Sequence, residues 1–223
     1  MIRELMASLA RPPSSQLAAN VAVMHPRTTG SLVLVEGLSD KAAVETVAKR
    51  LGRDLGAKGV IVVSMGGITN VGRFLEDYAR HRRDLKVASL YDEGGDSYVR
   101  SAMERVGLGI DLNRSQMEDL GFFACVNDLE EELIRSLGVE KVRELVASQD
   151  ELAGFQIMQS QPQWRDRDLA DQLHRFIGVR SGRKVRYGAL LSNMLDLSRL
   201  PRPLDLLMQH LEDGIRLGDG INT

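Results

Sequence analysis

Short apolar segments, each followed by an amphipathic stretch, are the feature that most constrains the fold of this chain. The segments near 31–36, 59–65, 86–91 and 121–126 are rich in Val, Leu, Ile and Ala, and helical spacing follows the first three. Strands that are apolar on both faces are typical of a parallel sheet covered by helices on each side. The sequence therefore predicts an α/β fold with a parallel sheet of about four strands.

Beyond Asp128 the strand pattern fades, and segments with helical spacing continue toward the end of the chain. We expect a helical C-terminal layer that contains Trp164 and Phe176 as core residues. The predicted organisation has three parts: an N-terminal arm or tail (1–29), an α/β domain (30–138) and a helical region that completes the site (139–223).

Composition narrows the class of protein. The hydrophobic content of 43% fits a soluble globular protein, and the net charge of −2 argues neither for nor against a polyanionic partner. Cys125 is the single cysteine, so an intrachain disulfide is excluded and a reducing compartment is favoured. No apolar run approaches the ~18 residues of a membrane helix. We therefore expect a cytoplasmic protein without membrane contact.

Acidic side chains directly follow three of the four predicted strands. Glu36 and Asp40 follow the first, Asp92 begins "DEGGD" after the third, and Asp128 begins "DLEEE" after the fourth. The carboxyl ends of parallel strands meet at one edge of the sheet, where ligands bind. Carboxylates gathered there repel one another unless cations neutralise them, and oxygen ligands suit Mg²⁺ or Mn²⁺. Two such ions can promote phosphodiester cleavage.

Most of these acids also have an ordinary structural explanation. Asp40 lies in the first turn of a predicted helix, where the helix dipole favours an acid. Asp128 is a good N-cap, and the acids after it are equally typical of a solvated first turn. Glu36 differs, because it ends a buried strand and caps nothing evident. Its position favours a chemical role.

The segments "LVEGLSDKAAVE", Gly66-Gly67 and "SLYDEGGD" together resemble the Toprim domain of topoisomerases, bacterial primases, recombination-mediator proteins and overcoming-lysogenization-defect (OLD) nucleases. The later segments "ACVNDLEEELIRSLG" and "SGRKVRYGALL" are similar to the OLD branch. The resemblance implies a Rossmann-like Toprim fold. It also implies that Glu36 is a general acid/base and metal ligand, with Asp40 as the extra acid of the OLD branch.

The resemblance further implies a complete two-metal site. OLD nucleases add an Asp-x-Glu pair and a lysine, which by position are Asp128, Glu130 and Lys184. The second Toprim motif is Asp-x-Asp, but Gly94 stands at its second position here, so that carboxylate has to come from Glu93 or Asp96. The predicted catalytic residues are Glu36 and Lys184, and the predicted metal ligands are Glu36, Asp40, Asp92, Asp96, Asp128 and Glu130.

Basic residues far outnumber acids around Lys184, because Asp196 is the one acid between Gln172 and Pro203. A basic stripe beside a metal site suits a phosphate backbone and supplies affinity without sequence recognition. Solvated arginines on a helical layer are the alternative. The predicted nucleic-acid contacts are Arg180, Arg183, Arg186 and Arg199.

These observations predict a Mg²⁺- or Mn²⁺-dependent nucleic-acid phosphodiester hydrolase, a DNA endonuclease or nickase, with DNA favoured as substrate. Gly94 favours the alternative of a catalytically weakened Toprim module that binds nucleic acid or a partner ATPase. A different phosphotransfer enzyme on the same architecture also stays open, since fold alone does not fix function. The sequence lacks the ATPase that precedes the Toprim domain in full-length OLD proteins, so we expect any ATPase partner to be a separate chain. A homodimer is left open.

Overall fold

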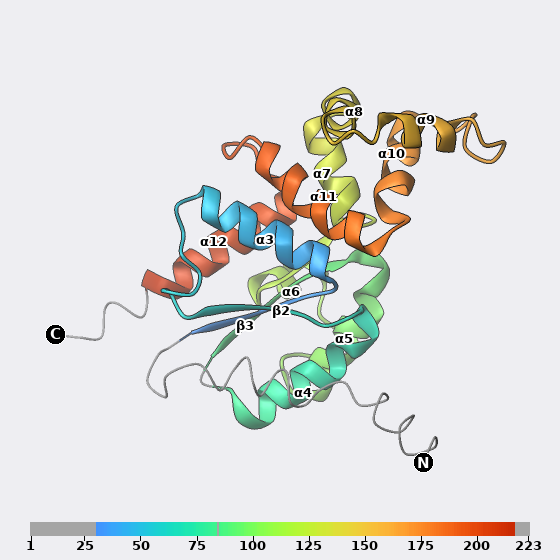
Figure 1. Ribbon diagram of the computed structural model, residues 1–223. Helices are drawn as coiled ribbons and strands as arrows, with labels where there is room; N and C mark the ends of the chain where they lie inside the picture. The colour runs from blue at the N-terminus through green and yellow to red at the C-terminus, as the bar shows by residue number, and fades with distance from the viewer. Residues whose placement is uncertain (1–29, 84, 217–223) are drawn as a thin grey trace, which may run out of the picture.

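A four-stranded parallel sheet forms the centre of the molecule (Figure 1). The computed structural model describes residues 30–83 and 85–216, so the predicted arm at 1–29 lies outside the described residues. The strand order β2-β1-β3-β4, with every pair parallel, confirms the predicted α/β fold. The strands are β1 (Ser31–Val35), β2 (Val60–Ser64), β3 (Lys86–Asp92) and β4 (Phe122–Cys125).

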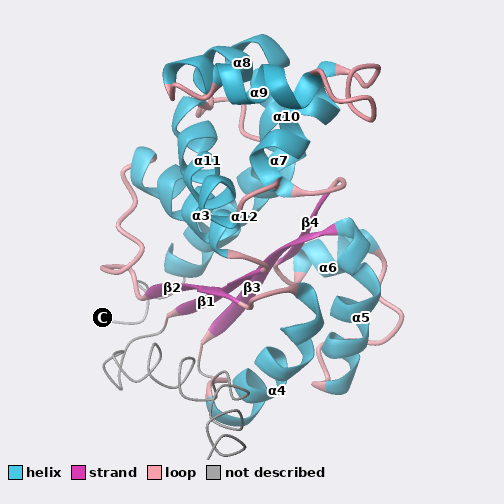
Figure 2. Cartoon of the chain, turned by 45° about the vertical axis from the view of Figure 1, so that its right-hand side comes forward, coloured by secondary structure: helices cyan, strands magenta, loops and turns pink. Residues whose placement is uncertain are grey.

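One face of the sheet is covered by three helices (Figure 2). These are α4 (Val71–His81), α5 (Asp96–Arg105) and α6 (Arg114–Asp119). Leu32 and Tyr91 point from the strands into the apolar core on this side. The sequence did not predict α6, although its start carries a capping box. The Asn113 side chain accepts the Gln116 N–H, and the Gln116 side chain accepts the Asn113 N–H.

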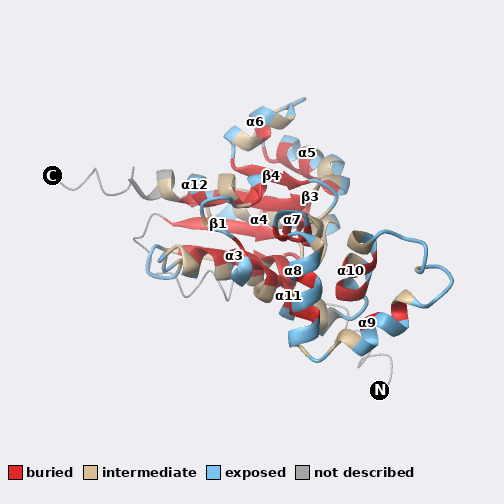
Figure 3. Cartoon of the chain, turned by 90° about the horizontal axis from the view of Figure 1, so that it is seen from above, coloured by how far each residue is buried: buried red, intermediate tan, exposed pale blue. Residues whose placement is uncertain are grey.

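The opposite face packs against helices from both halves of the chain, and the strands between the helices are largely buried (Figure 3). These helices are α3 (Leu38–Arg50), α7 (Leu129–Leu137), α11 (Ser181–Met194) and α12 (Arg202–Arg216). Val33 and Leu90 of the sheet share one core with Val44 of α3, Leu191 of α11 and Leu207 of α12. The C-terminal helices are therefore part of the core that supports the sheet, and the predicted domain boundary after residue 138 stays a prediction.

Three further helices lie beyond α7 at one end of the molecule, as Figure 1 shows. They are α8 (Val139–Ser148), α9 (Leu152–Gln159) and α10 (Leu169–Gly178). The helical pattern predicted over 139–159 is broken by Asp150, whose backbone adopts a positive φ of 57°. Within the described residues, no helix is both long and apolar enough to cross a bilayer.

The strand order creates a switch point at the carboxyl edge of the sheet. Strand β1 lies between β2 and β3, so the chain leaves β1 on one side and later returns on the other. Open α/β sheets bind ligands at such switch points. Val35 pairs with Leu90, which brings Glu36 beside the end of β3. The topology thus places the first and third acidic groups next to each other.

Candidate functional site

Glu36 and Asp92 form the centre of the site, at the ends of the two central strands. Glu36 Oε1 accepts the backbone N–H of Asp92 at 2.9 Å. Burial raises the pKa of Glu36, and this hydrogen bond and the charge of Lys184 oppose that effect only in part. Burial, followed by the charge of Glu36, raises the pKa of Asp92 to about 8. The two groups therefore do not ionise easily together in the absence of a cation.

Asp40 joins them from the first turn of α3. Asp40 is 7% exposed, and its Oδ2 accepts the Gly37 backbone N–H at 2.7 Å. This hydrogen bond agrees with the structural explanation of Asp40 as a first-turn acid of a helix. A carboxylate at a helix N-terminus ordinarily has a lowered pKa. Here burial and the charge of Glu130 raise the pKa of Asp40 to about 7. Helix capping alone does not account for an acid held in this environment.

Asp128 is the N-cap of α7 and also contacts α10. Its Oδ1 accepts the Glu131 N–H at 2.8 Å, and its Oδ2 lies 2.5 Å from Nε2 of His174. Burial alone would raise the pKa of Asp128, but the hydrogen bonds from His174 and Glu131 outweigh it and the pKa is lowered. The four histidines are scattered along the sequence without metal-ligand spacing, which predicts a surface or packing role for His174. The fold makes it a partner of the site.

Glu130 is the most deeply buried acid of the site, with 2% exposure. Its Oε2 forms an ion pair with the Lys184 ammonium at 3.1 Å, and no other described residue gives this oxygen a hydrogen bond. A buried carboxylate oxygen without a hydrogen bond is costly. With the Lys184 ammonium as its one partner among the described residues, this oxygen is incompletely satisfied.

Lys184 provides the ammonium group at this edge. It lies in the first turn of α11, where a cation is disfavoured by the helix dipole. Burial would lower the pKa of Lys184, but Glu130 above all raises it, so the side chain stays charged. The same charge also acts on Glu36 and Asp40. Acidic neighbours therefore hold Lys184 at an otherwise unfavourable position, and its catalytic role stays a prediction.

A close approach of two helices sets the position of Lys184. A Cβ atom at Gly188 would lie 2.6 Å from the backbone oxygen of Ser39, so only glycine allows α11 to cross the start of α3 at this distance. Lys184 precedes Gly188 by four residues and lies on the same face of α11. The crossing therefore carries the ammonium group to the start of α3, where Asp40 lies.

A hollow of about 350 Å³ opens at this edge of the sheet, lined in part by Glu36, Asp40, Ser64, Asp92 and Lys184. No three His, Cys, Asp or Glu side chains of the described residues converge closely enough, as they stand, to hold one ion. The donor chemistry nevertheless fits a divalent cation. Several carboxyl groups have raised pKa values, and a buried carboxylate oxygen has no hydrogen bond.

Asp96 does not join this cluster. It begins α5, where its carboxylate accepts hydrogen bonds from the Tyr91 hydroxyl at 2.9 Å and from Arg100 at 2.8 and 2.9 Å. Burial opposes the effect, but these partners keep the pKa of Asp96 low. Glu93 instead accepts the Asn127 N–H at the end of β4. The structure thus places neither alternative to the missing second Asp against Asp92, and the predicted Asp96 ligand is directed elsewhere.

The predicted nucleic-acid contacts divide into two groups. Arg183 and Arg186 both form ion pairs with Glu151, and Arg183 also stacks on Phe176, which leaves its side chain 14% exposed. Arg183 is therefore a structural ion-pair residue. Arg180 and Arg199 are exposed and have no ion pair with any described residue. Arg186 keeps a side chain that is 47% exposed despite its ion pair, so Arg183 is the one predicted contact among the four that is mostly covered.

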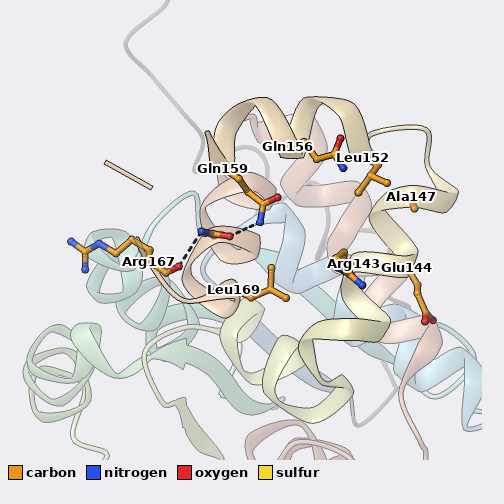
Figure 4. Close-up of a pocket in the computed structure, with 9 residues that line it drawn as sticks. Arg143, Glu144, Ala147, Leu152, Gln156, Gln159, Arg167 and Leu169 are labelled. Atoms are coloured by element: carbon orange, nitrogen blue, oxygen red, sulfur yellow. Dashed lines mark hydrogen bonds between the residues drawn. The ribbon is translucent and has the colours of Figure 1, made fainter. Parts of the chain in front are cut away.

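A second hollow, of about 640 Å³, lies among α8, α9 and α10 (Figure 4). Arg143, Glu144 and Arg167 line it, but no cluster of acids does. Gln172 beneath it is fully hydrogen-bonded: its Nε2 donates to the backbone oxygens of Trp164 and Arg167, and its Oε1 accepts from Gln159. Although this hollow is larger, its chemistry indicates a supporting framework, and the carboxyl edge remains the candidate site.

Comparison with protein-family models identifies a match for the part of the chain that forms this edge. Residues 30–93 match the family described as overcoming lysogenization defect protein-like, TOPRIM domain. This segment is an OLD-like Toprim domain. It contains Glu36, Asp40 and Asp92, whereas Asp128 and the acids and lysine after it lie beyond the matched residues.

Solved structures are similar to a larger part of the chain, which includes the C-terminal helices. The C-terminal region of the Xanthomonas campestris pv. campestris OLD protein is similar with a TM-score of 0.63 and 22% identity, covering 85% of this chain and 97% of that one. The C-terminal region of the Burkholderia pseudomallei OLD protein gives 0.59 and 18%, covering 85% and 100%. At these identities the likeness shows the fold alone. No curated protein matches the sequence.

Proposed function

We propose that this protein is a metal-dependent nucleic-acid phosphodiester hydrolase, a nickase or endonuclease with DNA as its favoured substrate. The observation that carries the proposal is the imbalance of charge at the carboxyl edge, where several buried carboxylates face one lysine and Glu130 Oε2 lacks a hydrogen bond. A divalent cation would remove that imbalance.

In this proposal five acids at the carboxyl edge would bind two ions. Glu36, Asp40 and Asp92 would hold one Mg²⁺ or Mn²⁺, and Asp128 with Glu130 would contribute to the second. When bound, such ions activate a water and stabilise the leaving oxygen of a phosphodiester. Glu36 holds or moves the proton of that water, because burial keeps its pKa raised. Lys184 stabilises the negative charge that develops on the phosphate.

The test is cleavage of supercoiled plasmid by the purified protein, with Mg²⁺ or Mn²⁺ and with chelator. We expect nicked or linear product only with metal, and complete loss with Glu36→Gln, which removes one charge at nearly unchanged shape. Glu104→Gln on the exposed side of α5 is the matched control and should cleave normally. A Glu36→Gln variant that cuts at the full rate would remove Glu36 from the mechanism.

A second candidate function rests on a specific observation. Gly94 replaces a motif acid, and Asp96 is bound to Tyr91 and Arg100, which favours a weakened module that binds nucleic acid or a partner ATPase. Calorimetric titration with Mn²⁺ separates the two. Two bound ions support the hydrolase, and one or none supports the binding module. A cytoplasmic location belongs to both proposals.

A further inference from the structure

Trp164, the only tryptophan in the chain, lies in the loop between α9 and α10. This loop projects from the helical end of the molecule, as Figure 2 shows. Phe176 is buried, as the sequence predicted, but Trp164 is only partly buried against the core. One part of the indole ring therefore packs against the core, and the other part lies at the surface.

Two hollows meet at Trp164. One, of about 500 Å³, is lined by Trp164, Arg175 and also His174, and the other, of about 280 Å³, is lined by Trp164, Arg175 and Arg180. The Arg175 guanidinium lies 5.6 Å from the centre of the indole ring. The smaller hollow has two further polar walls, the amides of Gln161 and Gln163, and no acid lines it. We call Trp164, Arg175 and Arg180 the Trp164 surface.

Buried hydrogen bonds hold the Trp164 surface in place. Gln172 is 5% exposed, and its Nε2 donates to the backbone oxygen of Trp164 at 2.8 Å and to that of Arg167 at 3.0 Å. The backbone N–H of Trp164 donates to the backbone oxygen of Gln161 at 2.9 Å. A loop fixed in this way loses little conformational freedom when it binds a ligand.

The Trp164 surface is linked to the carboxyl edge through α10. His174 contacts Asp128 with its ring and lines the larger hollow, and Arg175 is the next residue along the helix. A strand that leaves the carboxyl edge past His174 would therefore meet Arg175 and Trp164 next. The single acid in the larger hollow, Asp171, lies on the first turn of α10.

We propose that the Trp164 surface binds unpaired nucleotides of the substrate strand next to the scissile site. The proposal rests on the proposed function and deepens it by naming the substrate class. Bases stack on aromatic rings without sequence preference, and arginines hold the phosphates. The smaller hollow lies near the lower limit of ligand pockets, which suits a single nucleotide better than a duplex. A strand that is single, frayed or at a junction satisfies these conditions.

The single tryptophan makes a direct test available. The protein is titrated with unlabelled single-stranded DNA, the same sequence as single-stranded RNA, and the DNA duplex, all in chelator so that nothing is cleaved. Stacking on Trp164 should quench its fluorescence with the single strands, and added salt should reverse the effect. The duplex should quench little. Quenching by DNA, by RNA or by both names the source of the strand, and absence of quenching by both overturns the proposal.

Variants report binding independently of fluorescence, through the anisotropy of a labelled single strand. Trp164→Leu keeps an apolar side chain against the core but removes the ring, and we expect roughly 5- to 100-fold weaker binding. Arg180→Ala, at an exposed position, should also weaken it, whereas Arg73→Ala on the exposed side of α4 should not. Trp164→Leu and Arg180→Ala proteins that both bind like the wild type would refute the proposal.

The two proposals fail in different ways. Metal-dependent plasmid cleavage that depends on Glu36, without any binding at Trp164, would overturn only the inference about the Trp164 surface. Strand binding at Trp164 without metal-dependent cleavage would support that surface and overturn the proposed hydrolase.

Discussion

Helix α11 takes part in two groups of charged side chains that differ in their balance. Its Arg183 and Arg186, together with the Tyr187 hydroxyl, surround the single carboxylate of Glu151. Burial would raise the pKa of Glu151, but these partners outweigh it and the pKa is lowered. The next residue after Arg183 is Lys184, which alone supplies an ammonium group to the carboxylates at the carboxyl edge.

The difference separates a carboxylate that the fold satisfies from a group of carboxyl groups that it does not. Around Glu151 two arginines and a tyrosine hydroxyl satisfy the one carboxylate, so this acid needs no further partner. At the carboxyl edge the pKa values of Asp40 and Asp92 are raised to about 7 and about 8, and one oxygen of Glu130 has no hydrogen bond. Perturbed carboxyl groups of this kind concentrate at functional sites. Four substitutions test the contrast.

The largest expected effect is on turnover, from Lys184→Ala. Loss of one group that stabilises transition-state charge typically costs ~10²–10³ in rate. We expect that loss in single-turnover cleavage with saturating metal, with the circular dichroism spectrum unchanged. Lys49→Ala, at an exposed position in the last turn of α3, is the matched control. Normal turnover by Lys184→Ala would assign Lys184 to charge balance alone.

The substitution Glu151→Gln tests the Glu151 group and should affect the stability of the fold. Arg183 is 14% exposed and would lose its charged partner, so we expect the free energy of unfolding to fall by about 2 kcal/mol. Urea denaturation measures this. Glu140→Gln breaks an exposed pair with Arg143 and should cost less than about 0.5 kcal/mol. An equal effect of both substitutions would show that the Glu151 group carries no special stability.

A smaller effect of opposite sign is expected from Asp92→Asn. In the folded protein the pKa of Asp92 is raised from 3.8 to about 8, so between these values the folded state keeps a proton that the unfolded chain has lost. The free energy of unfolding therefore falls as pH rises through this range, without metal. Asp92→Asn removes this loss. It should raise the free energy of unfolding at pH 8 by about 1 kcal/mol, which corresponds to a rise in Tm of a few degrees.

The same experiment carries its own controls. Near pH 3 the wild type and Asp92→Asn should melt at similar temperatures, because Asp92 is then protonated in the folded state and largely so in the unfolded one. Mg²⁺ at pH 8 should stabilise the wild type more than the variant, since binding to the folded state adds to stability. A variant that is less stable at both pH values would mean that Asp92 serves packing.

The smallest effect is expected from Arg199→Ala, since Arg199 is exposed and forms no ion pair with a described residue. Binding of labelled DNA should weaken several-fold, and the slope of log affinity against log salt should decrease by about 1. Arg183→Ala should instead lower the Tm, because Arg183 pairs with Glu151. An unchanged salt slope with Arg199→Ala would exclude this residue from the phosphate contacts.

The sequence by itself determined the sheet and the acids at its edge. The strand runs "SLVLV" and "VIVVS" are apolar apart from one terminal serine each, which favours cover on both faces and so a parallel sheet. Once the strands are parallel, the residues after them share one edge. Glu36, Asp92 and Asp128 follow from that rule because each comes soon after its strand, and local pattern is sufficient to place them.

Only the tertiary structure decided which other side chains reach that edge. Lys184 arrives because Gly188 lets α11 cross α3 at close range, and His174 arrives because α10 packs against α7. Asp96 belongs to the same motif as Asp92, yet Tyr91 and Arg100 draw it to the other side. The direction of a helical side chain depends on where its helix packs. That packing is set by contacts between residues far apart in the chain, which local sequence does not encode.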